Sequence, residues 1–405
     1  MLEVGSFSIA PLDIPADSSL TKELPRLKRH LKSESTRLQE WHREGADGRE
    51  VCAARSAVID TLLATLFDWT LDTFEPKKRE RKLTMTLVAI GGYGRSELNP
   101  HSDIDFMLLH SGTTPSVTRI FNHELIEKLT GPGGLIYTLY DLGMKVGYSV
   151  RNIQDAINVA NDDMQTKTSL IESRLISGDA GLFEQFQKRV EVKCVRSHID
   201  DYLQMRITDQ DARRVKFGNS ALLQAPNIKN GCGGLRDYQN LLWMTHFKYG
   251  TRTLAELEAQ EMIRPNNRAQ LEEGYGFLLR VRNELHYQTK RPSDDLHKAL
   301  QPKVAWQLGY KDRSPARRLE AFMRDLYMHM RRIHLITRMV ERRLALRPKP
   351  SRRIPLLRSL FGGGEKQETL DGFQVIEGEL VPVSSRVFKD QPQRLMRVFL
   401  HAQQR

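Results

Sequence analysis

Asp103 and Asp105 are the residues in this chain whose spacing most clearly suggests chemistry. They stand at the start of an apolar stretch that reads as a β-strand. Side chains two positions apart on a strand point to the same face. Two adjacent carboxylates repel each other, and they are costly unless a cation lies between them. A divalent metal ion that carries a nucleoside triphosphate meets this need. The alternative is an acidic strand end that is simply solvated.

A glycine-rich turn, with Gly91, Gly92 and Gly94, lies shortly before the two aspartates and follows the apolar stretch 83–90. Glycine has no Cβ, so backbone N–H groups of such a turn can approach a phosphate closely. No Gly-Lys-Ser/Thr follows, which excludes a Walker A loop, and Glu97 stands where a dinucleotide fingerprint needs its third glycine. The combination of strand, glycine turn and Asp-x-Asp therefore indicates a phosphate and metal site of another kind.

This arrangement, with Ser102 directly before the first aspartate, resembles the nucleotidyltransferase superfamily. The resemblance implies that Asp103 and Asp105 hold two Mg²⁺ ions and that Gly91 and Gly92 line the β- and γ-phosphates. It also implies a third carboxylate on a later strand of the same sheet. Asp141 is the candidate, as a metal ligand and as the base toward the acceptor hydroxyl. A turn or cap residue is the alternative for Asp141.

A second signature, Lys-Asn-Gly-Cys-Gly-Gly-Leu-Arg-Asp over 229–237, is more restrictive than the Asp-x-Asp pattern. Together with 147–151, 168–175 and 282–286, it resembles the N-terminal half of the bacterial PII uridylyltransferase family, from about residue 80 to about residue 345. The resemblance implies Mg²⁺-dependent transfer of UMP from UTP to a tyrosine hydroxyl of a PII-type nitrogen regulatory protein. Two alternatives stay open: adenylyl transfer to glutamine synthetase or another protein, and a non-catalytic module that senses a nucleotide.

Four further residues are candidates for contact with the nucleotide. Arg95 follows the glycine turn and adds a positive contact, and Ser102 orients the loop or touches a phosphate. Lys229 and Arg236 are placed to clamp the triphosphate from the helical domain. The alternative for these two is a helix N-terminus with an internal pair between Arg236 and Asp237.

The elements around these residues predict an α+β protein with a small mixed sheet followed by a mainly helical bundle. The resemblance to nucleotidyltransferases implies that this sheet is polymerase-beta-like. Residues 1–17 read as irregular, and 20–42 and 51–73 have the spacing of helices. We expect strands at 83–90, 106–109 and 135–139 and a helix at 119–129, with helices on one side of the sheet. The predicted regions are an N-terminal helical region (1–80), the nucleotidyltransferase core (81–150), the helical uridylyltransferase-associated domain (151–346), and a basic linker and tail (347–405).

Composition limits the classes of protein. The net charge is +12, and residues 301–405 alone hold 22 Lys and Arg against 10 Asp and Glu. Such a surplus can attract nucleic acid or an acidic protein surface. The basic residues are not interleaved with stacking aromatics, so nucleic acid is not the favoured partner.

No long apolar window and no signal-peptide pattern are present, and the three cysteines are widely spaced. We expect a cytoplasmic protein without a membrane partner.

The end of the sequence adds one expectation. In full-length members of the resembled family an HD phosphohydrolase domain and paired ACT domains follow the helical domain. This sequence contains no His-Asp dipeptide. The resemblance therefore implies a chain without the uridylyl-removing half, as a fragment or as a short form.

Overall fold

The computed structural model describes residues 2–74, 83–112, 124–197, 199–343, 369–376, 379–384 and 386–403. The chain divides into two compact units, Met1–Pro348 and Lys349–Arg405. The first unit combines a small mixed sheet with many helices, which confirms the predicted α+β class. The finer division of this unit into three domains stays a prediction.

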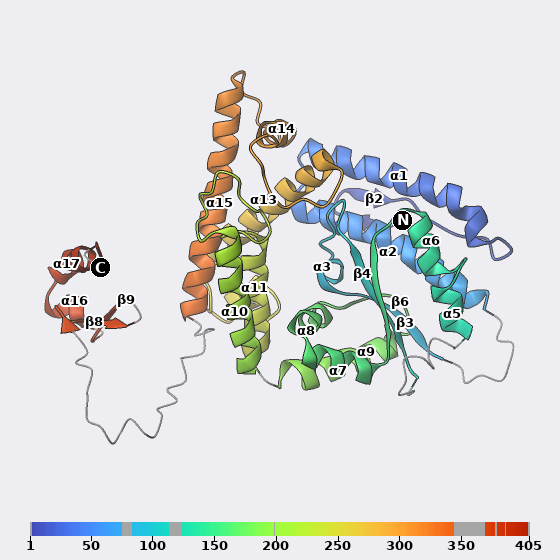
Figure 1. Cartoon of the computed structure of the whole chain (residues 1–405), viewed down its shortest axis with the longest axis horizontal. Coiled ribbons are helices and arrows are strands. Elements are labelled where there is room, and N and C mark those ends of the chain that lie inside the picture. Colours follow the sequence, from blue (N-terminus) through green and yellow to red (C-terminus); the bar gives the residue numbers. More distant parts are fainter. Residues whose placement is uncertain are drawn as a thin grey trace. The chain divides into compact units, whose positions relative to one another are not determined.

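The described elements of the first unit alternate between helices and short strands (Figure 1). Its strands are β1 (Leu2–Val4), β2 (Phe7–Ile9), β3 (Met85–Ala89), β4 (Ile104–His110), β5 (Val146–Arg151) and β6 (Arg174–Gly178). Its first helices are α1 (Leu20–Glu44), α2 (Gly48–Asp72), α3 (Gly91–Gly94), α5 (Glu124–Thr130), α6 (Leu135–Asp141), α7 (Ile153–Asp162), α8 (Met164–Ile171) and α9 (Ala180–Val190). The later ones are the π-helical turn η1 (Glu191–Val195), α10 (Ile199–Phe217), α11 (Leu235–Tyr249), α12 (Leu254–Ala259), α13 (Pro265–Thr289), α14 (Gln301–Gln307) and α15 (Pro315–Arg343).

The main sheet has four strands in the order β5-β4-β3-β6. Strand β4 is antiparallel to β3 and parallel to β5, and β6 is antiparallel to β3. All five residues of β3 are buried, as expected of a central strand covered on both faces. The strand that begins with the Asp-x-Asp pattern is therefore held between two neighbours.

Helices cover both faces of this sheet, and the prediction of helices on one side only is wrong. Phe106 and Leu108 of β4 pack in one cluster with α1, α2, α5 and α6. Met107 and Leu109 point the other way and pack with α7, α8 and α9. This alternation follows from the period of two along a strand. In Figure 1, α1 and α2 lie on one side of the sheet and α7 to α9 on the other.

Three local predictions differ from the structure. Residues 135–139 form the start of helix α6, because Leu135, Ile136 and Leu139 are all buried at helical spacing. The sequence pattern over 164–175 predicts one helix, but helix α8 ends at Ile171, and Arg174–Gly178 form β6 against β3. The irregular start contains the hairpin of β1 and β2. The beginning of the helix expected at 119–129 falls outside the described residues, which show α5 from Glu124.

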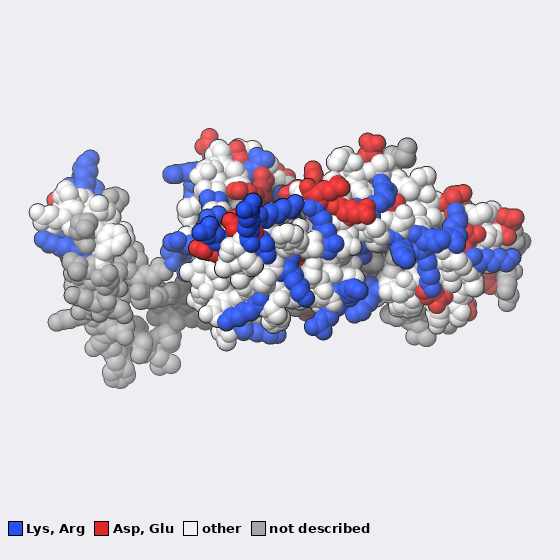
Figure 2. Space-filling view, turned by 90° about the horizontal axis from the view of Figure 1, so that it is seen from above, with Lys and Arg blue, Asp and Glu red and all other residues white. Residues whose placement is uncertain are grey.

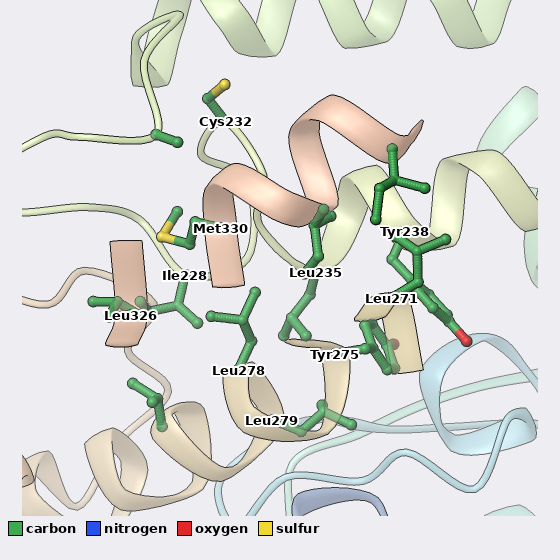
Figure 3. Close-up of a cluster of buried hydrophobic side chains, with 14 of the residues drawn as sticks. Ile228, Cys232, Leu235, Tyr238, Leu271, Tyr275, Leu278, Leu279, Leu326 and Met330 are labelled. Atoms are coloured by element: carbon green, nitrogen blue, oxygen red, sulfur yellow. The ribbon is translucent and has the colours of Figure 1, made fainter. Parts of the chain in front are cut away.

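A second hydrophobic core holds the helical region together. Figure 3 shows side chains of the 228–235 segment, α11, α13 and α15 packed into one buried hydrophobic cluster. The residues labelled there are Ile228, Cys232, Leu235, Tyr238, Leu271, Tyr275, Leu278, Leu279, Leu326 and Met330. Burial of this much apolar area fixes the turn over 228–235 against three helices. The Lys229 and Arg236 positions are thereby rigidly supported.

The second unit is small. It contains a three-stranded antiparallel sheet of β7 (Thr369–Leu370), β8 (Phe373–Ile376) and β9 (Glu379–Pro382), with helices α16 (Val387–Asp390) and α17 (Arg394–Gln403). The sequence pattern predicts two strands within 373–382 and a helix over 392–401, and β8, β9 and α17 are present there, with β7 in addition. The first part of the predicted linker and tail, residues 347–364, lies outside the described residues.

Two surface properties bear on partners. None of the described helices is both long and apolar enough to span a membrane. Figure 2 shows basic and acidic side chains interspersed on the displayed face of the first unit. Interspersed charges of both signs are typical of a solvated surface.

Candidate functional site

The glycine turn lies between β3 and β4 and forms the four-residue helix α3. The backbone N–H groups of Gly94 and Arg95 donate to the carbonyls of Ile90 and Gly91. The N–H groups of Gly91, Gly92 and Tyr93 precede these bonds and have no partner among the described residues. A Cβ at Gly94 would lie 2.1 Å from the carbonyl oxygen of Glu172, so only glycine fits there. The turn is thus pressed against the end of α8 with three donors left free.

Asp103 and Asp105 flank the first residue of β4. Asp103 is exposed and Asp105 is half-buried. Burial raises the pKa of Asp105, the charge of Asp103 raises it further, and Lys229 partly opposes the shift. Neither carboxylate forms an ion pair or a side-chain hydrogen bond with any described residue. Two such carboxylates side by side make a site that favours a cation.

A cavity of about 540 Å³ lies between the sheet end and helices α8, α10, α11 and α13. Eight of the nine residues that the sequence singled out line this cavity. They are Gly91, Gly92, Arg95, Ser102, Asp103, Asp105, Lys229 and Arg236. Residues more than a hundred positions apart in the sequence are therefore brought to one place.

Most charged groups that line the cavity are paired with each other. Arg95 Nη1 lies 2.6 Å from Glu172 Oε1, and its Nε lies 2.7 Å from Glu97 Oε2. Three further pairs share this arrangement: Arg206 with Asp209 at 3.4 Å, Arg213 with Asp209 at 3.3 Å, and Arg282 with Asp294 at 2.6 Å. These contacts fix side chains in place and cancel charge locally.

Two cations and two carboxylates remain after this pairing. Lys229 and Arg236 have no carboxylate within ion-pair distance among the described residues, and Asp103 and Asp105 have no cation. Free cations attract phosphate, while free carboxylates attract a metal ion. The cavity therefore carries the two kinds of group that a metal–triphosphate complex needs.

Burial of Lys229 and Arg236 in the cavity wall lowers the pKa of both side chains. Burial, with the nearby Arg282 and Arg236, lowers the pKa of Lys229 to about 8. Burial, with Arg95 and Arg206, lowers the pKa of Arg236 to about 10. The Arg236 guanidinium also lies 5.0 Å from the centre of the Trp243 ring. An anion in the cavity would relieve the repulsion among these cations.

Of the alternative interpretation, the helix N-terminus is present, since α11 begins at Leu235, but the internal pair between Arg236 and Asp237 is wrong. The carboxylate of Asp237 is fully buried, pairs with Arg213 and Arg214 of α10, and accepts the N–H of Gly233 at 2.8 Å. Asp237 therefore fixes the turn over 229–237 against α10. Arg236, the next residue toward the N-terminus, is left to face the cavity.

Asp141 is the ninth residue, and the structure does not bring it to the cavity. It is the last residue of α6 rather than part of a strand, it is exposed, and it is not among the lining residues. The neighbour of Asp105 on β5 is Gly147, not a carboxylate. The described residues hold no group of three or more His, Cys, Asp or Glu arranged to bind a metal ion. A role for Asp141 in metal binding remains a prediction from the sequence alone.

Arg95 and Ser102 both line the cavity, but they differ in the contacts that hold them. Arg95 is held by two glutamates, so its main effect is to tie the glycine turn to α8 and to the ring of Trp243, 6.0 Å away. The N–H of Ser102 donates to the carbonyl of Asn99, which shapes the loop before Asp103. Both positions agree with a role in shaping the site.

A buried polar network behind the aspartates was not foreseen from the sequence. Asn99 Nδ2 donates to Asn283 Oδ1 at 2.6 Å, and Arg282 donates to Asn99 Oδ1. The N–H of His101 donates to His286 Nδ1 at 3.2 Å. The stretch 282–286 belonged to the motifs that carried the family resemblance, but spacing along one helix did not reveal what it contacts.

Comparisons with known proteins agree with the resemblance. Residues 201–341 match the family model described as GlnD PII-uridylyltransferase. A bifunctional uridylyltransferase/uridylyl-removing enzyme of Rhodospirillum rubrum is 30% identical over 357 residues, which are 88% of this chain and 37% of that protein. Proteins of the same description from Caulobacter vibrioides (29%; 89% of this chain, 38% of theirs) and Azospirillum brasilense (30%; 88% and 36%) are also similar.

These findings confirm the resemblance to the PII-uridylyltransferase family. The match covers most of this chain. The chain spans between a third and two fifths of the length of the curated relatives that it matches. What those relatives act on is carried over to this chain only as a proposal.

Proposed function

We propose that this chain is a Mg²⁺-dependent nucleotidyltransferase that moves UMP from UTP to a tyrosine hydroxyl of a PII-type protein. One observation carries the proposal: a single cavity holds two unpaired carboxylates, two unpaired cations and the free N–H groups of a glycine turn. The names of the similar proteins support the choice of UTP and of the acceptor. A cytoplasmic location is part of the same proposal.

The residues fit a magnesium site. Carboxylate oxygens are the ligands that Mg²⁺ prefers, and it usually completes its shell with water and substrate phosphates. Asp103 and Asp105 would hold the metal. Burial and then the charge of Asp103 raise the pKa of Asp105, and a cation bound between the two carboxylates would oppose that rise. Bound Mg²⁺, as two ions in the family scheme, neutralises phosphate charge and lowers the pKa of the attacking hydroxyl.

The remaining residues bind and orient the triphosphate. The free N–H groups of Gly91 and Gly92 face the β- and γ-phosphates from the sheet side. Lys229 and Arg236 hold the same phosphates from the helical side. Holding the triphosphate between the glycine turn and the two cations would align the α-phosphorus with the incoming hydroxyl and the departing pyrophosphate. The family role of Asp141 as base is not supported by its position outside the cavity lining.

A labelled-nucleotide assay tests this function. The purified chain is mixed with Mg²⁺, a PII protein and either α-labelled UTP or α-labelled ATP. We expect label on PII from UTP, no label with Asp105→Asn, and label with Asp162→Asn, an exposed aspartate of α7 that serves as the matched control. Label from ATP would replace the proposal with adenylyl transfer. Binding of Mg²⁺–UTP without transfer to any acceptor would favour a sensing module instead.

A further inference from the structure

Strand β5 is an edge of the main sheet. It pairs with β4, and no other described strand lies beyond it. Gly147 and Tyr148, in its middle, are exposed. An edge with unpaired backbone groups is a ready template for another strand.

The open backbone groups of this edge can be assigned. The N–H of Ile104 donates to the carbonyl of Lys145 at 3.0 Å, so the polar groups of residue 145 face β4. Backbone groups alternate sides along a strand, so those of Val146, Tyr148 and Val150 face away from the sheet. The N–H groups of these three residues have no partner among the described residues. The edge therefore offers a short ladder of free donors and acceptors.

This edge lies directly beside the candidate metal ligands. Asp105 is opposite Gly147 in the register of β4 and β5. A Cβ at Gly147 would lie 2.4 Å from Asp105 Oδ1, so any larger residue would push against the carboxylate. The Asp105 carboxylate therefore lies over Gly147, in the space that a side chain at residue 147 would fill. A side chain of a segment laid along the open edge can approach the carboxylate with no β5 side chain between them.

The other face of the same edge carries an exposed aromatic cluster. Tyr148 of β5 and Tyr137 and Tyr140 of α6 are 37%, 46% and 49% exposed. The Tyr137 and Tyr140 rings lie 6.4 Å apart, edge to face. Partial burial, with Tyr140 and then Tyr137, raises the pKa of Tyr148, which places the three phenols near one another. Exposed tyrosines are enriched where proteins bind each other.

We propose that the acceptor protein docks an extended segment along β5, as an added strand, with its reactive tyrosine opposite Gly147. This inference rests on the proposed function and names the surface that delivers its acceptor. Strands lie about 5 Å apart, so the added strand would run roughly 10 Å from β4. Alternate side chains of that segment would point to the Asp105 face and to the tyrosine cluster. Main-chain bonds give such docking its affinity, and the flanking pockets give its specificity.

The proposed docking implies the following transfer step. The phenol oxygen that crosses above Gly147 forms a bond to the α-phosphorus, and the bond from that phosphorus to the oxygen bridging to the β-phosphate breaks. Pyrophosphate leaves with the electron pair, and the phenol proton passes to solvent. No other reactant is needed.

Proline at residue 148 tests the docking mode. Tyr148→Pro removes an outward N–H at an edge, where proline is tolerated, and Tyr148→Val keeps the N–H while it removes the ring. We expect Tyr148→Pro to raise the KM for the acceptor at least tenfold and Tyr148→Val to raise it less. The affinity for Mg²⁺–UTP should stay within twofold of the parent in both variants. An unchanged acceptor KM in Tyr148→Pro would overturn the docking surface and leave the proposed function standing.

A cross-linking measurement covers the case in which Tyr148→Pro does not fold. A photoreactive phenylalanine replaces Tyr140 in one variant and Val215 in a second, because Val215 is 89% exposed on α10, away from this edge. With a PII protein and Mg²⁺–UTP, cross-links from residue 140 alone are expected. Cross-links from residue 215 alone would contradict the proposal. If the parent chain binds Mg²⁺–UTP but transfers no label to the PII protein, the proposed function itself is contradicted.

Discussion

Asn99 Nδ2 donates to Asn283 Oδ1 over 2.6 Å, and both side chains are buried. This bond joins the loop before Asp103 to helix α13, whose sequence position is almost two hundred residues away. Arg282, the neighbour of Asn283, donates to the same asparagine and pairs with Asp294 in the cavity wall. The position of the candidate metal ligands therefore depends on the helical region as well as on the sheet.

Removal of this bond should weaken both the fold and the site. Asn99→Ala leaves one donor of Arg282 buried without a partner, which costs about 1–3 kcal/mol. It also removes one of the two donors to Asn283 Oδ1, which then keeps only the Cys52 thiol at 3.5 Å. We expect the free energy of unfolding, measured by urea denaturation, to fall by at least that much. Asn158→Ala, at an exposed position of α7, is the control and should change it by less than about 0.5 kcal/mol. Equal effects of the two substitutions would contradict the role of the network.

Asp105→Asn should lower the rate of transfer without lowering the stability of the metal-free protein. Loss of one charged contact at the reacting centre costs roughly a hundredfold or more in rate. The same substitution should not destabilise the metal-free protein. The folded state raises the pKa of Asp105, so ionisation opposes folding above that pKa, and the asparagine avoids this cost. We expect an equal or higher melting temperature at pH 7 in chelator, with the gain lost at about pH 4 and below. A lower melting temperature at pH 7 would contradict the unpaired state of this carboxylate.

Lys229 predicts a pH dependence of nucleotide binding. Its pKa is about 8, lowered mainly by burial, so it is charged at pH 7 and loses its charge as the pH rises through that value. Only the charged form attracts the triphosphate, so affinity should fall above pH 8, by up to about tenfold per pH unit. Lys229→Arg keeps its charge at high pH and should flatten this fall between pH 8 and pH 9.5. Calorimetric titration with UTP at several pH values measures the effect. Parallel pH profiles for the parent and Lys229→Arg would contradict the role of Lys229 in this pH dependence.

The glycine turn offers a matched pair of substitutions. A Cβ at Gly94 would meet the carbonyl oxygens of Glu172 at 2.1 Å and of Ala89 at 3.0 Å, whereas a Cβ at Gly92 meets nothing closer than 3.7 Å. Gly94→Ala must displace backbone and should cost about 1–3 kcal/mol or more of stability. Gly92→Ala should leave the melting temperature nearly unchanged and act only on nucleotide affinity. Similar melting temperatures for both variants would show that the turn does not pack as described.

Much of the candidate site could be predicted from the sequence because its signals are local. The Asp-x-Asp spacing, the glycine turn and the Lys229–Asp237 signature each occupy a few consecutive residues. Each predicts its own strand end, turn or helix start. Lys229 and Arg236 line the same cavity as Gly91 and Gly92, and their contact with a nucleotide stays a prediction.

The rest of the site depends on contacts between distant segments. Arg95 lines the cavity, and its contact with the nucleotide stays a prediction, but local sequence could not show that Glu172, 77 positions away, pairs with it. Asp141 was placed on a strand because apolar residues alternate after it, yet the buried spacing before it belongs to helix α6. Strand β6 was missed because a short strand directly after a helix gives a weak periodic signal. Pairing across the fold, and not local pattern, decides these cases.

The central claim is that Asp103 and Asp105 hold a metal ion while Lys229 and Arg236 hold the triphosphate. The most direct measurement is the affinity for UTP with and without Mg²⁺, by calorimetry, in three proteins. In the parent chain Mg²⁺ should strengthen binding at least tenfold. The double variant Asp103→Asn with Asp105→Asn should lose this gain, while Lys229→Met should bind weakly in both conditions. An undiminished Mg²⁺ effect in the double aspartate variant would contradict the account.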